Sequence, residues 1–169
     1  DIKFIGVRDE RTGTHMADGY ARASNKPGVI LAGQNGPGAT NLVTGIAQAA
    51  AAFSPVVSIA GFISTKDKIK DAFQGVDQQS LFEPITKKTW TISKVKKIPK
   101  IFSKAFKLAM APRRGPVQIN LPRNILSEEA KFNINNEKKS YSHVDTTKGE
   151  KKDINKAIKI ISFASKPVV

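Results

Sequence analysis

An acid and a glycine-rich turn are the first residues of this chain that could share a chemical task. Glu10 follows the apolar run Lys3–Val7. The turn Gly36-Pro37-Gly38 follows the next apolar run, Gly28–Leu31. In an open α/β sheet, ligands gather at the carboxyl ends of strands, so an acid and a turn that follow strands can face one pocket. Glycine adds no side chain and proline fixes φ, which lets this turn approach a flat ring closely. The pairing predicts a cofactor site.

The elements that must position these residues alternate along the chain. Short apolar runs bounded by turn residues predict strands, and helical periodicity lies between most of them. Such alternation implies right-handed crossovers and a doubly wound α/β fold, a mostly parallel sheet with helices on both faces. The predicted strands are Lys3–Val7, Gly28–Leu31, Pro55–Ala60, Thr89–Ser93 and Pro116–Leu121, and the predicted helices are Arg11–Ser24 and Ala39–Ala52, the second with Leu42, Ile46 and Ala50 on its apolar face.

Two further segments have a distinct character. The stretch from Gly61 to Leu81 is the longest without clear periodicity, so it is predicted to border the site. Residues 127–150 are polar and cannot pack a core, which predicts an interdomain linker. After it, Asp153 is predicted to cap a helix that leads into Val168 and Val169, as at the entry of a second α/β domain.

The basic composition does not by itself indicate a nucleic-acid site. The chain has 169 residues and a net charge of +14. Its lysines recur at helical spacing opposite apolar residues, the pattern of a solvated helix face, at Lys97, Lys100, Lys104 and Lys107. We therefore predict that nucleic acid is not a partner. A basic module that binds RNA or a protein is the alternative of a different class, and it predicts salt-dependent binding.

Composition narrows the chemistry further. Cysteine is absent, which excludes disulfides and thiol catalysis and fits a reducing cytosol, so a cytoplasmic location is predicted. No apolar run approaches the roughly 20 residues that cross a bilayer, and no membrane partner is predicted. No metal-ligand spacing appears. The two histidines, His15 and His143, are far apart, and His15 is interpreted as a packing or polar-contact residue.

The motifs, taken in order, resemble the pyrimidine-binding domain of thiamine diphosphate enzymes of the acetolactate synthase and sulfoacetaldehyde acetyltransferase group. The family pattern is a strand, an acid, a small-residue helix, and then Gly-Pro-Gly-x-x-Asn. The resemblance covers residues 1–126. The matching residues are Glu10, Ala17-Asp18-Gly19-Tyr20-Ala21-Arg22, Gly36-Pro37-Gly38-Ala39-Thr40-Asn41, Phe73-Gln74, Asp77-Gln78 and Gly115–Arg123.

The resemblance implies roles for single residues. Glu10 matches the glutamate that hydrogen-bonds the aminopyrimidine N1′ and thereby activates thiamine diphosphate. Gly36, Pro37, Gly38 and Asn41 match the residues at that ring, and Phe73 and Gln74 match a pair on the substrate side. The bland alternatives are a helix-terminal acid at Glu10 and a plain turn at Gly36–Gly38. Many relatives have His before the glutamate; here Asp9 stands there, and we predict that its charge repels that of Glu10.

The resemblance also implies a larger enzyme. Residues 1–126 would be the pyrimidine-binding domain without its opening helix, residues 127–150 the linker, and residues 151–169 the start of a central α/β domain. Mg²⁺ would be held by a C-terminal domain that this sequence lacks, FAD is a further candidate cofactor, and the enzyme would be a homodimer or homotetramer. This chain alone is expected to be inactive.

The predicted reaction is that of an acetolactate-synthase-like decarboxylase and carboligase acting on a small 2-oxo acid or aldehyde. Gly45, Ile46, Ala47 and Asp71–Gln74 favour that group. His15–Gly19 and Gln34–Gly38 look closer to sulfoacetaldehyde acetyltransferase, which passes its two-carbon unit to phosphate. That activity and a simple 2-oxo acid decarboxylase remain the alternatives.

Overall fold

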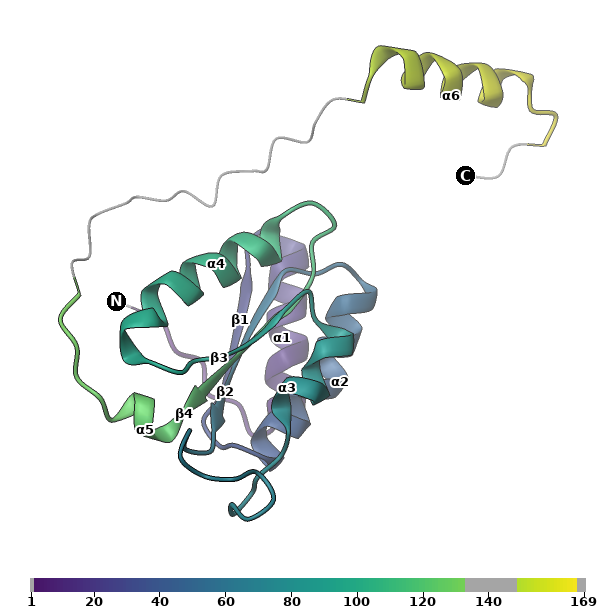
Figure 1. The fold of residues 1–169 in the computed structure, drawn as a ribbon. Helices are drawn as coiled ribbons and strands as arrows, with labels where there is room; N and C mark the ends of the chain where they lie inside the picture. Colours follow the sequence, from purple (N-terminus) through teal and green to yellow (C-terminus); the bar gives the residue numbers. More distant parts are fainter. Residues whose placement is uncertain (1, 133–148, 167–169) are drawn as a thin grey trace.

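A four-stranded parallel sheet lies at the centre of the computed structural model, which describes residues 2–132 and 149–166 (Figure 1). Its strand order is β1-β2-β4-β3. The strands are β1 (Gly28–Ala32), β2 (Val56–Phe62), β3 (Thr89–Thr91) and β4 (Val117–Pro122). The helices are α1 (Glu10–Ser24), α2 (Pro37–Ala51), α3 (Gln78–Phe82), α4 (Ile98–Met110), α5 (Arg123–Leu126) and α6 (Lys151–Phe163), with the 3₁₀ turns η1 (Glu83–Ile85) and η2 (Val95–Lys97).

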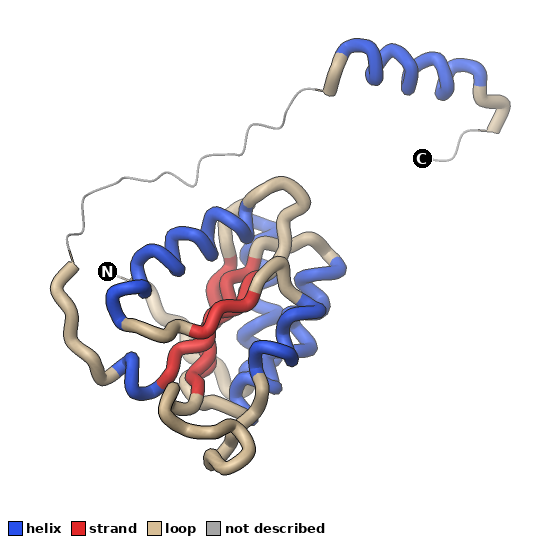
Figure 2. Tube along the Cα trace, viewed as in Figure 1, coloured by secondary structure: helices blue, strands red, loops and turns tan. Residues whose placement is uncertain are grey.

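The doubly wound α/β fold is confirmed, with helices on both faces of the sheet. Figures 1 and 2 show α1, α2 and α3 on one side and α4 on the other. Each strand follows a helix or turn that returns the chain to the same end of the sheet, so all carboxyl ends meet at one edge. The Gly36–Gly38 turn, the end of β2 and the end of β4 lie at that edge.

The predicted strand Lys3–Val7 is wrong. Residues 2–7 form an exposed extended segment that is not hydrogen-bonded into the sheet. This segment and β1 line a common cavity instead of pairing. Within the described residues, β1 is paired along one edge alone. The apolar side chains of Ile2, Phe4 and Ile5 remain exposed.

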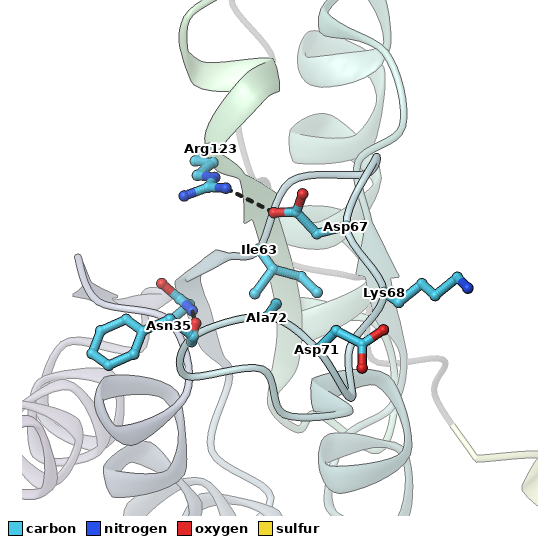
Figure 3. A pocket seen from close by; sticks show the side chains of 8 residues that line it. Asn35, Ile63, Asp67, Lys68, Asp71, Ala72 and Arg123 are labelled. Atoms are coloured by element: carbon cyan, nitrogen blue, oxygen red, sulfur yellow. Dashed lines mark hydrogen bonds and ion pairs between the residues drawn. The ribbon is translucent and has the colours of Figure 1, made fainter.

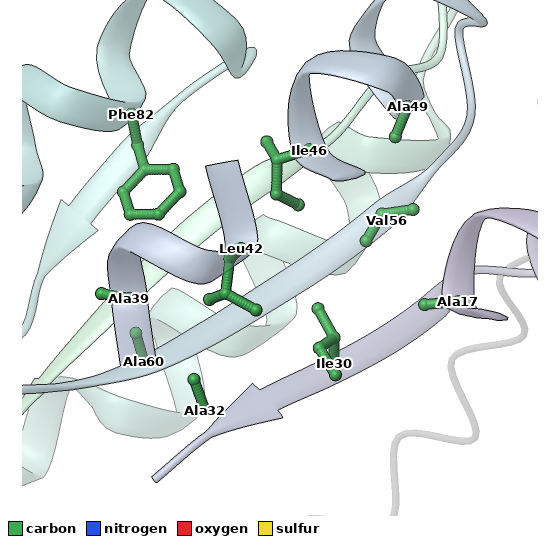
Figure 4. Close-up of a cluster of buried hydrophobic side chains, with 10 residues drawn as sticks. All are labelled: Ala17, Ile30, Ala32, Ala39, Leu42, Ile46, Ala49, Val56, Ala60 and Phe82. Atoms are coloured by element: carbon green, nitrogen blue, oxygen red, sulfur yellow. The ribbon is translucent and has the colours of Figure 1, made fainter. Parts of the chain in front are cut away.

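Two buried clusters hold the layers together. On the α1–α2 face, small residues dominate, with Ala17, Ala32, Ala39, Ala49 and Ala60 beside Ile30, Leu42, Ile46, Val56 and Phe82 (Figure 4). Burial confirms the predicted face of α2 at Leu42 and Ile46, although Ala49 rather than Ala50 completes it. On the α4 face, Val57, Ile59, Ile92, Ala105, Ala109, Val117, Ile119 and Ile125 form the second cluster.

The domain boundaries predicted for the region after β4 remain a prediction. Residues 133–148, most of the predicted linker, lie outside the described residues, as do Val168 and Val169. The predicted helix is present as α6, but Asp153 is not its cap. Glu150 occupies the N-cap position and Asp153 lies in the first turn, where a carboxylate favours the helix through the macrodipole instead.

Over residues 2–132 and 149–166, no helix combines the length and the apolarity needed to span a bilayer.

Candidate functional site

The structure brings Glu10 into contact with the predicted glycine-rich turn. Glu10 is half-buried at the first position of α1, and its Oε2 accepts a hydrogen bond of 3.0 Å from Asn41 Nδ2 of α2. A Cβ atom built on Gly38 would lie 3.4 Å from Glu10 Oε1. Three of the predicted site residues, Glu10, Gly38 and Asn41, therefore meet although more than two dozen residues of chain separate the acid from the turn.

Local packing fixes the start of α1. Asp9 is the N-cap and accepts a hydrogen bond of 2.8 Å from the Arg11 backbone N–H. Thr14 Oγ1 donates to the Glu10 carbonyl oxygen at 2.7 Å. Thr14 is held in turn by α2, since a Cβ on Gly45 would lie 2.5 Å from its side chain. The Glu10 backbone is thus positioned by contacts between α1 and α2.

The turn itself requires glycine at Gly36. Its φ is +57°, in the left-handed region, and a Cβ there would lie 2.4 Å from the carbonyl oxygen of Gln74. Pro37 occupies the first turn of α2, where its missing N–H is not needed. The buried Gly36 N–H donates to Gln78 Oε1 at 3.3 Å. Gln78 was not among the residues predicted for this site.

The predicted pair Phe73 and Gln74 lies in the loop that follows β2. Gln74 presents its backbone to the turn, because Asn35 Nδ2 donates to its carbonyl oxygen at 3.1 Å and to that of Phe73 at 3.4 Å. Phe73 is 88% exposed. It lines a different hollow, of about 350 Å³, together with Asn35 and Ile63.

That hollow is also lined by charged residues, Asp67, Lys68, Asp71 and Arg123 (Figure 3). Arg123 Nη2 donates to Asp67 Oδ2 at 2.7 Å, and the neighbouring Asn124 exchanges hydrogen bonds with Thr65 at 2.9 and 3.0 Å. These contacts tie the loop after β2 to the end of β4. That residues 61–81 border the cofactor site remains a prediction.

A larger cavity has Glu10 in its lining. Its volume is about 500 Å³, and it is lined by residues 2–10, residues 29–33 and Ile59. Most of its lining is apolar, with Glu10 and Asp9 among the ionisable groups that face it. A half-buried carboxylate at the end of such a cavity is chemically suited to hydrogen-bonding a heterocyclic ring.

The charge of Asp9 has its own partner. Arg11 forms an ion pair of 2.9 Å with Asp9, and the side-chain and backbone hydrogen bonds from Arg11 lower the pKa of Asp9 from its usual 3.8 to about 2. The Asp9 carboxylate is turned toward its own helix terminus. Repulsion between Asp9 and Glu10, predicted from their adjacency, remains a prediction.

The Ala-Asp-Gly-Tyr-Ala-Arg motif has a structural explanation. Asp18 is buried and forms a bidentate ion pair with Arg22 at 3.0 Å, and Arg22 also donates to Ser54 Oγ at 3.2 Å. A Cβ on Gly28 would lie 2.0 Å from the Ala17 carbonyl oxygen, so β1 packs directly on the α1 backbone. The motif therefore fixes α1 against the sheet rather than contributing to the site.

Other candidates lie elsewhere. His15 is exposed rather than packed, and His143 lies outside the described residues. Within residues 2–132 and 149–166, no group of three or more His, Cys, Asp or Glu side chains is arranged to hold a metal ion.

Residues 1–81 are similar to a protein family, and the whole chain is similar to individual proteins. Residues 1–81 match the family described as thiamine pyrophosphate enzyme, N-terminal TPP binding domain; thiamine pyrophosphate (TPP) is thiamine diphosphate. The chain is 44% identical to the probable acetolactate synthase large subunit of Methanococcus aeolicus, with 100% of this chain and 28% of that protein covered.

Two bacterial proteins are similar over the same extent. The acetolactate synthase large subunit of Buchnera aphidicola subsp. Schizaphis graminum is 43% identical, with 99% of this chain and 30% of that protein covered. The acetolactate synthase isozyme 3 large subunit of Escherichia coli is 38% identical, with 99% and 29% covered. The chain thus spans 28–30% of the length of these relatives.

Proposed function

We propose, on the premise that residues 1–81 belong to the thiamine pyrophosphate enzyme family through its N-terminal TPP binding domain, that Glu10 is the acid that activates thiamine diphosphate. The single observation that supports this role most directly is the contact of Glu10 with both Asn41 and Gly38. If Glu10 were only a helix-terminal acid, its contacts with a glycine-rich turn from the next βα unit would not be expected.

The residues present fit the aminopyrimidine ring of this cofactor. Asn41 Nδ2 donates a hydrogen bond to Glu10 Oε2. Within the described residues no hydrogen bond is made to Oε1, which faces Gly38. Oε1 is therefore free to hold a proton shared with the ring nitrogen N1′. The absence of side chains at Gly36 and Gly38 would let the ring approach the backbone there, and Pro37 keeps the turn stiff.

These contacts indicate which part of the chemistry the cofactor supplies and which part the residues of this chain supply. When bound, thiamine diphosphate supplies the electron sink that lets the bond between the carboxylate and carbonyl carbons of a 2-oxo acid break. Glu10 holds the proton at N1′, and Asn41 fixes the direction of the carboxylate. Phe73 and Gln74 are proposed to border the substrate, on the side of the loop that Asn35 attaches to the turn.

We propose the acetolactate synthase reaction for the whole protein, in which a two-carbon unit from one 2-oxo acid is joined to a second. The names of the similar proteins support that choice over transfer to phosphate or simple decarboxylation. The proposed protein is a cytoplasmic homodimer or homotetramer, binds Mg²⁺ through residues outside this chain, and has FAD as a candidate second cofactor.

The test uses the complete enzyme that contains this chain, with pyruvate as the 2-oxo acid. Glu10→Gln is expected to lower kcat by about 10²–10⁴-fold, the usual contribution of a positioned acid or base, while thiamine diphosphate binds within a few-fold of the parent affinity. Glu83→Gln, at an exposed glutamate of η1, is the matched control and is expected to leave both quantities unchanged. Full turnover by Glu10→Gln would contradict the proposal.

A further inference from the structure

We infer that Gln78 is a positioning residue that holds the Gly36 turn in the conformation the cofactor site needs; the inference rests on the proposed function. Gln78 is fully buried at the first position of α3. Its side chain makes three hydrogen bonds, each to a different element. The partners are the Gly36 N–H at 3.3 Å, the Gly61 carbonyl oxygen at 3.1 Å and Asn120 Oδ1 at 3.0 Å.

These three contacts join separate elements at the carboxyl edge of the sheet. Gly36 leads into α2, Gly61 lies in β2 and Asn120 lies in β4. The Gln78 amide uses its oxygen as acceptor for Gly36 and its nitrogen as donor for the other two, so its orientation is fixed. A buried amide that satisfies three backbone and side-chain partners constrains all of them, because leaving any one unpaired is costly.

A second buried amide fixes the first. Asn120 Oδ1 also accepts a hydrogen bond of 3.0 Å from Gln118 Nε2, and Asn120 Nδ2 donates to Thr91 Oγ1 at 3.2 Å. Both Gln118 and Asn120 are fully buried on the same face of β4 as α3. The network therefore extends from β3 through β4 to the Gly36 turn, and its members depend on one another.

The effect of Gln78 on the site is indirect. It does not hydrogen-bond Glu10; it holds Gly36, and Gly36 immediately precedes the helix that carries Gly38 and Asn41. A shift of this turn would move Gly38 and Asn41 relative to the Glu10 carboxylate, which accepts the 3.0 Å hydrogen bond from Asn41 and lies 3.4 Å from where a Cβ on Gly38 would be. Gln74 blocks one direction of that shift through its carbonyl oxygen, and Gln78 restrains the N–H side.

Four variants of the complete enzyme separate positioning from general stability. Gln78→Met keeps the length and volume of the side chain and removes its hydrogen bonds. Gln79→Met is the matched control, because Gln79 is the exposed neighbour on the same short helix and its own hydrogen bonds, with Thr89 and Thr91, are long at 3.5 Å. Asn120→Leu removes the acceptor for Gln78, whereas Asn120→Asp keeps an acceptor oxygen for it. The Thr91 hydroxyl, which donates to Gln79 Oε1 at 3.5 Å, would have to turn away from Gln79 to donate to the new oxygen.

Two measurements are made on each variant. Hydrogen exchange of residues 34–41, without cofactor, reports the turn itself, and calorimetric titration with thiamine diphosphate reports the site. In Gln78→Met and Asn120→Leu we expect exchange about tenfold faster and binding about tenfold weaker, as for one buried donor left unpaired, equivalent to ~1.4 kcal/mol. Gln79→Met should stay within about twofold of the parent in both, and Asn120→Asp, which keeps the acceptor but buries a carboxyl group, should lose less than Asn120→Leu.

The outcomes distinguish this inference from the proposed function. Unchanged exchange and binding in Gln78→Met would overturn the role of Gln78 while leaving the role of Glu10 standing. A parent enzyme that does not bind thiamine diphosphate would overturn the proposed function, and the exchange data would still decide whether Gln78 holds the turn. If Gln78→Met does not fold, the contrast between Asn120→Leu and Asn120→Asp decides, and equal behaviour of those two variants would refute the network.

Discussion

The two faces of the sheet are packed in different ways. On the α1–α2 face, five of the ten residues in the buried cluster are alanines, and glycines bring backbone against backbone or side chain. On the α4 face, the cluster consists mainly of valine and isoleucine, and Trp90, Phe102 and Phe106 pack around it. Small residues let backbones approach closely and have no rotamers that could relieve a clash, whereas the larger side chains of the α4 face keep the backbones farther apart.

This difference accounts for where the candidate site lies. Glu10, the Gly36 turn and Asn41 are all carried by α1 and α2, whose separation is set by contacts such as Gly45 against Thr14. Positions fixed at the level of single methyl groups suit a site that must hold a proton at one atom. The α4 face carries the helix with the lysine stripe and contributes none of the predicted site residues.

The largest loss of stability is expected when one methyl group is added where β1 packs on α1. Gly28→Ala would place Cβ 2.0 Å from the Ala17 carbonyl oxygen, a clash with backbone that no rotamer relieves. We expect a loss of roughly 3 kcal/mol or more in the free energy of unfolding, measured by denaturant titration. Gly33→Ala is the control, because a Cβ at Gly33 meets nothing within 4 Å, and it should change stability by less than about 0.5 kcal/mol. Equal effects would contradict the close-packed view of this face.

A pair of helix glycines should give effects of opposite sign. Gly45→Ala places Cβ 2.5 Å from Thr14, so overpacking outweighs the gain in helix propensity and the variant should lose about 1–2 kcal/mol. Gly19→Ala lies in α1 with open space around its Cβ and should gain about 0.5–1 kcal/mol. Thermal unfolding of both variants tests the difference. A gain in Gly45→Ala would show that α1 and α2 can separate without cost.

The ion pair between Asp9 and Arg11, at the start of α1, can be tested through the pH dependence of stability. The pKa of Asp9 falls from 3.8 to about 2 because Arg11 pairs with it, so this interaction is complete above about pH 4 and is lost as the pH falls toward 2. Asp9→Asn keeps the capping oxygen and removes the titration. We expect its melting temperature to fall less steeply between pH 4 and pH 2 than that of the parent.

Arg11→Gln should also make the melting temperature fall less steeply between pH 4 and pH 2, because it removes the partner of Asp9 rather than Asp9 itself. Melting curves recorded at half-unit steps of pH give both comparisons. Profiles parallel to that of the parent would mean that the ion pair at 2.9 Å does not act in solution.

The smallest effect is expected on the α4 face. Lys100→Gln with Lys104→Gln alters two exposed residues on the outer side of α4, and stability should change by less than about 0.5 kcal/mol, with thiamine diphosphate binding unchanged. This double variant also tests the alternative of a basic binding module. Salt-dependent affinity for RNA that drops on the double substitution, measured by fluorescence anisotropy, would favour that alternative over the enzyme.

Much of the sheet could be predicted from the sequence because its strands are short apolar runs between turn residues. β1, β2, β3 and β4 lie within one or two residues of their predicted bounds. The run Lys3–Val7 has the same composition but pairs with nothing among the described residues, and composition cannot reveal whether a partner strand is adjacent. Likewise, Asp153 has the type of an N-cap residue, yet the helix begins before it.

The candidate site was predictable to the extent that it follows local motifs. Glu10, Gly38 and Asn41 belong to motifs with fixed spacing, and the fold brings them together. Gln78 belongs to the Asp77-Gln78 match, but nothing in that motif marks its side chain as a contact of the turn, because Gly36 is 42 positions away in the chain. Long-range hydrogen bonds of a single amide leave no periodicity or spacing that a sequence pattern could reveal.

The turns at the amino ends of the strands contain none of these site residues. There Arg114 donates to Asn25 Oδ1, and the guanidinium of Arg113 lies 5.3 Å from the ring centroid of Phe53. Since parallel strands direct every amino end away from the Gly36 turn, a fluorophore attached at exposed Lys26 would sit at the opposite pole from the proposed ligand. Such a label offers a way to follow rotation and assembly of the protein in real time without obstructing the chemistry being observed.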